Sequence, residues 1–353
     1  MSSLARLGWG PFFETQRERL GRSDLQCARV VEEQRGAWRV AGEFDGWAQV
    51  SGRFRHEAAS SAGFPAVGDW LGVADGVIHV RFDRRSTVSR AAAGRAVDEQ
   101  VVAANVDTIF LVTAFGEVSA DLNPRRLERY LTMVWEAGAV PVVVLNKADL
   151  SADPDGETES LRSRLPLVDV VTISALHDED GLQVLDRYLQ PAQTVALLGS
   201  SGVGKSTLVN RLVGSAAQRV SEIAADGKGR HTTTARHLIE LPDGALLIDT
   251  PGMRELQPWA DGSAVESVFD DITTLAQACR FADCAHASEP GCAVLEAVES
   301  GRLHEDRLEN YRRLLREAAF EERKRDASVA AEHKRRWKQI HQANKMLYKL
   351  RDR

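Results

Sequence analysis

Residues 199–207 read Gly-Ser-Ser-Gly-Val-Gly-Lys-Ser-Thr, and this stretch decides the fold class of the chain. It matches GxxxxGK[ST], in which glycines let the backbone bend until successive N–H groups point at phosphate oxygens. Lys205 can reach the β and γ phosphates of a nucleotide, and the Ser206 hydroxyl can ligate Mg²⁺. The pattern predicts a nucleotide-binding loop made of Gly199, Ser200, Ser201, Gly202, Val203, Gly204, Lys205, Ser206 and Thr207.

The flanking sequence places this loop between a strand and a helix. The apolar run Thr194 to Leu198 comes directly before it, and an apolar helical pattern, Leu208 to Val213, follows. A helix that starts here presents its positive N-terminal end to an anion. The alternative, a glycine-rich turn without a ligand, is disfavoured by this context.

Further apolar runs extend the pattern in both directions. They alternate with helical stretches such as Arg125 to Ala137, and they cover residues 106–114, 140–145, 168–173, 194–198 and 245–248. Val/Ile/Leu runs separated by helices are typical of a parallel sheet covered on both faces. We predict an α/β domain over residues 91–257.

Two short motifs at strand ends indicate the base. Asn146 to Asp149 (NKAD) follows one apolar run, and Ser174 to Leu176 (SAL) follows the next. The Asp149 carboxylate can accept from N1–H and the exocyclic amine of guanine, and a backbone N–H in SAL can meet guanine O6. NKAD alone could also be a helix cap, but both motifs at strand ends favour guanine. The predicted base-binding residues are Asn146, Lys147, Ala148, Asp149, Ser174 and Ala175.

The magnesium and γ-phosphate elements follow the loop. Asp249 to Gly252 (DTPG) comes after the run 245–248, so that Asp249 would hold Mg²⁺ through water and the Gly252 N–H would contact the γ-phosphate. Residues 229–234 (GRHTTT) form a polar loop of the kind that orders around this phosphate and relaxes after hydrolysis. The sequence does not choose among Thr232, Thr233 and Thr234. The predicted magnesium ligands are Ser206, Thr233, Thr234 and Asp249.

These elements are those of a translation-factor-type GTPase, but their order is unusual. NKAD and SAL precede the phosphate loop, whereas in ordinary GTPases they follow the aspartate motif. We interpret the chain as a circularly permuted P-loop GTPase. The segment after DTPG then leads directly into a C-terminal Cys/His region.

The sequence lacks the residue that usually orients the attacking water in GTP hydrolysis. Many GTPases have glutamine directly after the DxxG element, and here that position is Met253. Intrinsic hydrolysis should therefore be slow. His231 is a candidate for the missing polar group, although it could instead only cap its loop. The predicted catalytic residues are Lys205, His231 and Gly252.

Cys279, Cys284, His286 and Cys292 have the spacing C-x₄-C-x-H-x₅-C. Three thiolates and one imidazole complete a tetrahedral set with no open position, which predicts one structural Zn²⁺. The alternative is a group of ordinary buried thiols beside a solvent-facing histidine. Cys27 lies far away in sequence and is interpreted as a small buried hydrophobe.

Residues 24–90 contain five short apolar-alternating runs separated by turn residues, which predicts a small β-barrel of the oligonucleotide-binding (OB) type. A fragment of a β-sandwich is the alternative. Arginines near the strand ends could track phosphates, and exposed aromatic side chains could stack on bases. At least two of Trp38, Trp47 and Trp70 are expected in the core.

Charged residues are distributed unevenly along the chain. The chain has a net charge of −6, yet residues 301–353 contain sixteen Lys and Arg against nine Asp and Glu. This favours a basic helical tail that contacts an anionic polymer, with a solvated, salt-bridged helix as the alternative. No apolar run approaches the roughly 18 residues of a membrane span, so no membrane partner is expected. The first twenty residues lack the apolar core of a secretory signal, which makes the cytoplasm the default expectation, and a monomer is the default for the oligomeric state.

Taken together, the motifs resemble those of the ribosome small-subunit-dependent GTPase A family over about residues 24–330. Pro65 to Asp69 (PAVGD) and Ser288 to Cys292 (SEPGC) are similar to that family as well. The resemblance implies an OB barrel at 24–90, a permuted GTPase domain at 91–257 and an α-helical zinc-binding segment at 258–300, and the charge pattern adds the basic helical tail at 301–353. It implies GTP hydrolysis to GDP stimulated by the small ribosomal subunit, contact with its rRNA, a role in late subunit maturation, and release after hydrolysis. The extension 1–23 and the tail lie outside the matched part.

Two other functions stay open from the sequence. A GTP-sensing RNA-binding module without catalysis would fit Met253. A P-loop ATPase or small-molecule kinase would fit the phosphate loop, but it would leave NKAD unexplained.

Overall fold

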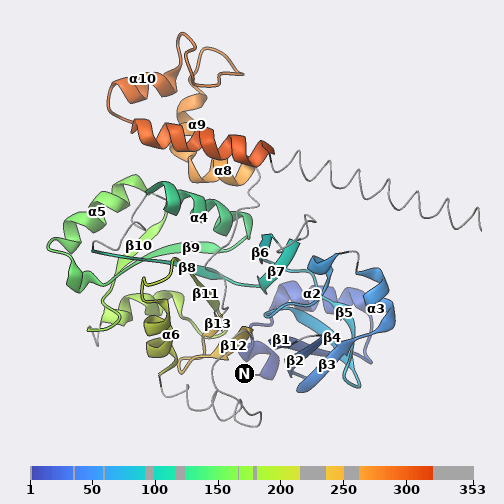
Figure 1. The fold of residues 1–353 in the computed structure, drawn as a ribbon. Helices are drawn as coiled ribbons and strands as arrows, with labels where there is room; N and C mark the ends of the chain where they lie inside the picture. The colour runs from blue at the N-terminus through green and yellow to red at the C-terminus, as the bar shows by residue number, and fades with distance from the viewer. Residues whose placement is uncertain are drawn as a thin grey trace, which may run out of the picture. The chain divides into compact units, whose positions relative to one another are not determined.

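The computed structural model describes residues 2–34, 36–58, 60–91, 99–116, 124–165, 167–177, 181–214, 236–249 and 262–320 (Figure 1). The chain forms two compact units. One comprises Met1–Ala91 with Asp98–Pro258, and the other comprises Ala92–Val97 with Trp259–Arg353. Among the described helices, none is both long enough and apolar enough to cross a membrane.

A closed five-stranded barrel opens the first unit. Its strands are β1 (Gln26–Gln34), β2 (Ala37–Gly42), β3 (Gly46–Val50), β4 (Trp70–Ala74) and β5 (Val77–Arg81). They follow the order β1-β2-β3-β5-β4, and β4 pairs with β1 to close the ring. Closure leaves no unpaired edge between these strands. All five predicted strands are present, and the predicted barrel is confirmed.

The three tryptophans of the barrel differ in how deeply they are buried. Trp38 and Trp70 lie in the core, whereas the side chain of Trp47 on β3 is 46% exposed. This agrees with the expectation that at least two of the three are core residues. Helix α3 (Gly52–Glu57) and the short helix η1 (Ser61–Gly63) connect β3 to β4.

The α/β part is built on five parallel strands, as predicted. They are β8 (Thr108–Ala114), β9 (Val140–Asn146), β10 (Asp169–Thr172), β11 (Thr194–Leu198) and β13 (Leu246–Asp249), in the order β10-β9-β8-β11-β13. The helical elements between them are α4 (Pro124–Glu136), η2 (Ala148–Leu150), α5 (Pro154–Arg164), η3 (Gly181–Tyr188) and α6 (Lys205–Val213). The strands bury almost every side chain, because helical segments cover them.

Three further strands were not predicted. A hairpin of β6 (Thr87–Ala91) and β7 (Glu99–Ala104) forms a separate two-stranded sheet. Strand β12 (Arg236–Glu240) lies antiparallel to β13 on one side and to β1 on the other. Through β12, the barrel and the parallel strands form one continuous sheet of eleven strands.

The first residues of the chain pack against the barrel. They form α1 (Ser3–Arg6) and α2 (Pro11–Leu20). The Trp9 ring meets Trp70 and Phe82 edge-on, with centroids 4.8 and 5.3 Å apart, and Phe13 is fully buried. This segment, whose role the sequence left open, completes the apolar core of the barrel.

A buried arginine joins three parts of the first unit. Arg29 on β1 donates to the carbonyl oxygens of Leu7 at 2.6 Å, Gly68 at 3.1 Å and Asn105 at 3.1 Å. Burial lowers the pKa of its guanidinium to about 10. Gly68 has φ +91°, and a side chain there would collide with the carbonyl oxygen of Ala104. This close approach explains the glycine of the PAVGD motif.

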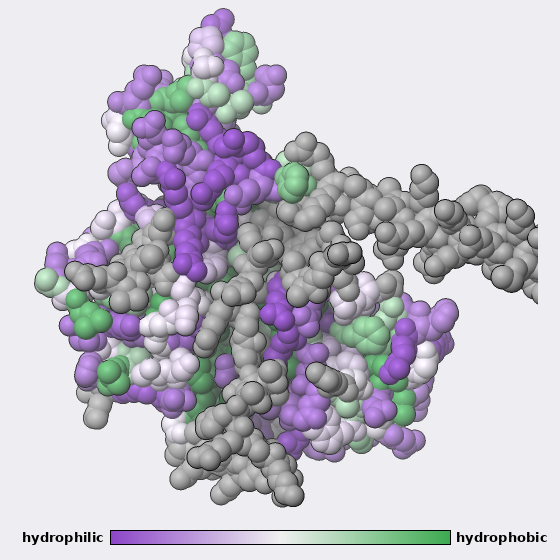
Figure 2. All heavy atoms as spheres, viewed as in Figure 1, coloured by the Kyte–Doolittle hydropathy of each residue, from purple (hydrophilic) through white to green (hydrophobic). Residues whose placement is uncertain are grey.

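The second unit is helical. It contains α8 (Gly262–Val268), α9 (Asp270–Ala276), α10 (Ala293–Glu299) and a helix over residues 305–320. Phe269 lies in its core against Tyr311, and Arg307 forms a two-pronged ion pair with Asp271 at 2.7 and 2.8 Å. Hydrophilic residues predominate on the face of this unit seen in Figure 2. The rest of the predicted helical tail, from residue 321, lies outside the described residues.

Candidate active site and metal centre

The predicted nucleotide motifs gather at one edge of the parallel strands. NKAD starts at the last residue of β9, and SAL follows β10. The phosphate loop follows β11, and Asp249 is the last residue of β13. Because these strands are parallel, their carboxyl ends lie at the same edge, where ligands of open α/β sheets bind.

The glycines of the phosphate loop are required by its backbone. Gly199 has φ +150°, and a side chain there would collide with the carbonyl oxygen of Val112 on β8. Gly204 has φ +96° and lies directly against the amide nitrogen of Asn146. Helix α6 begins at Lys205, so its N-terminal N–H groups face the loop. The Lys205 ammonium donates to the carbonyl oxygens of Gly199, at 2.6 Å, and of Ser200.

Asn146 connects the phosphate loop with both base motifs. Its Nδ2 donates to the carbonyl oxygen of Val203 at 2.8 Å, and its Oδ1 accepts from the Ala175 N–H at 2.9 Å. The side chain is buried, with 2% of the residue exposed. The sequence gave no sign of this bridge, because its three residues are far apart in the chain. The sequence predicted that a backbone N–H of SAL meets guanine O6; in this structure the Ala175 N–H of that motif orients Asn146.

Asp149 is held in place as an ionised acceptor. The Ser174 hydroxyl donates to its Oδ1, and this hydrogen bond is the main reason that the pKa of Asp149 lies below its ordinary value. His177 Nε2 lies 3.8 Å from the other carboxylate oxygen. The Ala148 N–H donates to the carbonyl oxygen of Ile173 at 3.1 Å, which joins NKAD to the end of β10. The carboxylate is therefore fixed in direction and remains charged at neutral pH.

The structure places Asp249 at the end of β13, the strand beside β11, which leads into the phosphate loop. Strand β13 pairs with β11 in parallel, with Ile248 opposite Ala196. The other predicted switch and catalytic residues lie outside the described residues; they are His231, Thr232, Thr233, Thr234, Thr250, Pro251, Gly252 and Met253.

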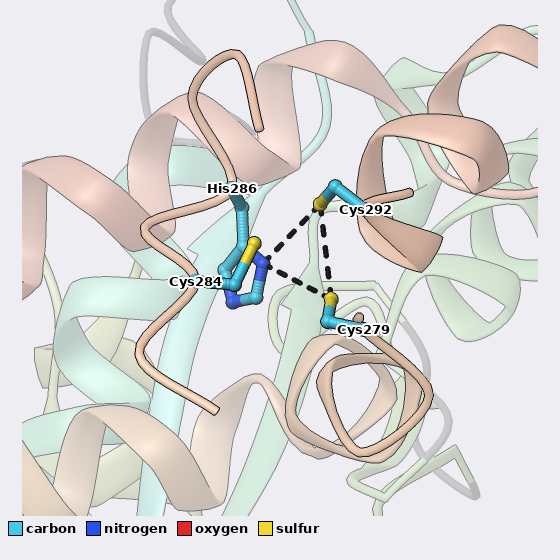
Figure 3. A group of neighbouring side chains, drawn as sticks. All are labelled: Cys279, Cys284, His286 and Cys292. Atoms are coloured by element: carbon cyan, nitrogen blue, oxygen red, sulfur yellow. Dashed lines mark hydrogen bonds between the residues drawn. The ribbon is translucent and has the colours of Figure 1, made fainter. Parts of the chain in front are cut away.

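The predicted Cys/His residues come together in the second unit (Figure 3). The ligand atoms of Cys279, Cys284, His286 and Cys292 all lie within 4.8 Å of one another. Cys279 Sγ is 3.8 Å from Cys292 Sγ, which is far too long for a disulfide bond of about 2.05 Å. His286 Nδ1 lies 3.6 Å from Cys279 Sγ and 3.5 Å from Cys292 Sγ. The cluster can hold a metal ion.

Local backbone geometry directs these four side chains inward. Cys292 caps α10, and its sulfur accepts from the Leu295 N–H at 3.5 Å. His286 adopts φ +55°, which turns the loop sharply. The Glu289 carboxylate accepts from three backbone N–H groups of this loop, those of Ala285, Ala287 and Ser288. Hydrogen bonding from the backbone N–H of Glu289 itself, and then from these N–H groups, lowers the pKa of Glu289 to about 2. The sequence did not identify this anchor, although Glu289 lies within the SEPGC motif.

Cys27 is buried in the barrel, as expected, and burial raises the pKa of its thiol to about 11. A neutral thiol in an apolar core is a small hydrophobe. It takes no part in the metal cluster.

Comparison with known proteins agrees with this architecture. A family model described as RsgA GTPase matches residues 81–259. The small ribosomal subunit biogenesis GTPase RsgA of Opitutus terrae is 44% identical over 362 residues, which cover 97% of each chain. The protein of the same name from Methanosarcina acetivorans is 46% identical over 284 residues, covering 78% of this chain and 76% of that protein.

Two solved structures are also similar. YjeQ from Thermotoga maritima has a TM-score of 0.63 at 26% identity, covering 84% of this chain and 99% of that one. YloQ, described as a circularly permuted GTPase, has a TM-score of 0.61 at 24% identity, covering 84% of this chain and 96% of that one. At that identity, the likeness to YloQ concerns the fold alone.

Fold and comparisons together define a circularly permuted P-loop GTPase with an N-terminal barrel and C-terminal helices. The chain belongs to the RsgA GTPase family, and it is a GTP-hydrolysing enzyme.

Replacing Ser174 with alanine tests how Asp149 is oriented. A hydrogen bond to a charged group contributes about 1.5–3 kcal/mol, so Ser174→Ala should weaken GTP binding about tenfold. Since that bond also lowers the pKa of Asp149, the variant should lose affinity at a higher pH than the wild type on acidification. Titration with a fluorescent GTP analogue from pH 7 down to about pH 4, close to the ordinary carboxyl pKa of 3.8, measures both effects, with Ser163→Ala on α5 as the control. Unchanged affinity and pH profile would contradict this assignment.

Proposed function

We propose that this GTPase docks on the small ribosomal subunit late in its maturation and leaves it after hydrolysing GTP to GDP and phosphate. The observation that carries the proposal is the convergence of NKAD, SAL, the phosphate loop and Asp249 at one sheet edge. In sequence, a barrel precedes this α/β part and a Cys/His segment follows it. The names of the two relatives described above support the choice of partner.

Each motif would bind a different part of the nucleotide. Asp149 accepts from the guanine edge, while Asn146 and Ser174 hold the base-binding loops in place. The phosphate loop and Lys205 surround the β and γ phosphates. Ser206 and Asp249, together with Thr233 or Thr234, would hold Mg²⁺, which neutralises charge that develops on the phosphates. His231 and the Gly252 N–H are the proposed contributors to hydrolysis.

The metal of the Cys/His cluster is proposed to be zinc. Zn–S and Zn–N bonds of about 2.3 and 2.0 Å place tetrahedral donors roughly 3.5–3.8 Å apart. The three separations measured among Cys279, His286 and Cys292 are 3.5, 3.6 and 3.8 Å. With four protein ligands the site has no open position, so its role is structural.

The barrel surface supports contact with rRNA. Trp47 is the one barrel tryptophan with an exposed ring, and Arg53 and Arg55 on the following helix are exposed as well. Arg84, which the sequence also suggested for phosphate contact, instead forms a buried ion pair with Asp69 at 2.6 Å. A base stacking on Trp47 and phosphates beside the two exposed arginines fit a single-stranded RNA segment. The basic tail would add salt-sensitive contacts.

Met253 left a non-catalytic GTP-sensing module open from the sequence, because methionine cannot orient a water molecule. Membership of the GTPase family decides for hydrolysis. We also propose that the protein acts as a monomer. Its proposed partner, the small ribosomal subunit, places it in the cytoplasm.

The decisive experiment measures GTP turnover by the full-length protein with and without purified small ribosomal subunits. Subunits should raise turnover by at least about tenfold, because the water-orienting group is missing from the free enzyme. Lys205→Ala should abolish the stimulated rate, and large ribosomal subunits are the control for nonspecific RNA. Equal GTP turnover with and without small subunits would contradict the proposed partner.

Zinc content tests the metal assignment. The purified protein should contain about one zinc ion per chain by plasma mass spectrometry, as expected for a closed four-ligand site. Cys284→Ser and Cys292→Ser should lose the metal, and chelation should lower the melting temperature, because metal binding stabilises the folded state. Cys27→Ser is the matched control and should retain its zinc. A wild-type protein without zinc, or equal loss in Cys27→Ser, would refute the assignment.

A further inference from the structure

Strand β12 lies between the barrel and the nucleotide site. On one side, Arg236 and His237 stand opposite Glu33 and Glu32 of barrel strand β1. On the other side, His237 stands opposite Asp249, the last residue of β13. A single short strand therefore separates the barrel wall from the aspartate proposed to hold magnesium.

A largely buried ion pair fastens the first residue of β12 to the barrel. Arg236 Nη1 lies 3.0 Å from Glu33 Oε2, and the two side chains are 10% and 30% exposed. The same nitrogen donates to the carbonyl oxygen of Val101 on β7 at 3.5 Å. Burial raises the pKa of Glu33, while the Arg236 charge opposes this rise. The Arg236 guanidinium therefore joins β12 to both β1 and β7.

The other end of β12 has a comparable ion pair in solvent. Arg6 and Glu240 are 3.1 Å apart, with side chains 59% and 40% exposed. Exposed pairs contribute little to stability, and this end is held instead by its backbone pairing with β13, where Glu240 stands opposite Leu246. The buried ion pair to the barrel lies at the other end, where His237 faces Asp249.

Stability alone does not account for a charged pair at this position. Removing ions from water is costly, and apolar side chains of the same volume often stabilise a protein as well or better. A charged pair does provide a contact of one defined geometry, whose loss leaves an unpaired buried charge. Such a contact can transmit a displacement between two elements.

We propose that Arg236 and Glu33 are positioning residues that couple the barrel to the magnesium site through β12. When RNA docks on the barrel, displacement of β1 passes through this pair to β12 and to Asp249 opposite it. Their contribution is to the stimulation of hydrolysis rather than to the chemical step. The inference rests on the proposed function, because it concerns stimulation by the small subunit.

The test compares GTP turnover of full-length variants with and without small ribosomal subunits. Glu33→Gln removes a charge with little change in shape, and Glu240→Gln makes the same change in the exposed pair. Glu33→Gln and Arg236→Gln should each lower the subunit-stimulated kcat about tenfold, within the usual range of coupling between sites. Unstimulated turnover and GTP affinity should not change. The double variant should be no worse than either single variant, because the two residues act as a pair.

Three results would overturn the coupling. The first is wild-type stimulation in both single variants. The second is an equal loss of stimulated and unstimulated turnover, which would assign the pair to the fold alone. If wild-type protein hydrolyses GTP but is not stimulated by subunits, the proposed function fails and the coupling fails with it. Melting curves establish folding, and Arg236→Lys, with a smaller expected loss, replaces Arg236→Gln if that variant does not fold.

Discussion

The buried amide of Asn146 donates to the Val203 carbonyl and accepts from the Ala175 N–H, so one side chain joins the phosphate loop to both base-binding loops. The three segments come from different strand ends, and no covalent connection keeps them in register. Gly204 has no side chain and lies directly against this amide. In the proposed site, the geometry of base and phosphate recognition therefore depends on one buried polar side chain whose oxygen and nitrogen are both hydrogen-bonded inside the protein.

Circular permutation changes the chain order without changing this interaction. The strands β8, β9 and β10 come first in sequence, yet β8 lies beside β11, which leads into the phosphate loop. The permuted order also lets β12 pair with the first barrel strand, so that barrel and α/β part share one sheet. Arg29 reinforces the same junction from inside the first unit. Only one strand, β12, therefore lies between barrel strand β1 and strand β13, which ends at the edge of the predicted nucleotide site.

Local sequence patterns were sufficient to predict much of the fold and of the candidate site. The phosphate loop, NKAD and the Cys/His spacing are contiguous signals, and the five parallel strands are unbroken apolar runs whose burial the structure confirms. Strand β12 was missed because Arg-His-Leu-Ile-Glu is short and charged at both ends, and only its partners make it a strand. Arg29 was missed for a related reason, since its three acceptors lie 22, 39 and 76 residues away. The sequence also could not choose the exposed tryptophan, because strand alternation predicts sidedness only after the register is known.

Binding of GTP to Asn146→Asp tests most directly whether this amide organises the site. Aspartate has nearly the same shape and can still accept from the Ala175 N–H, but it cannot donate to the Val203 carbonyl. We predict that GTP affinity falls by more than about tenfold, because a buried acceptor loses its donor. Asn210→Asp, on the exposed face of α6, should bind like the wild type. Wild-type affinity in a folded Asn146→Asp protein would show that the loops hold their geometry without this bridge and would contradict the account.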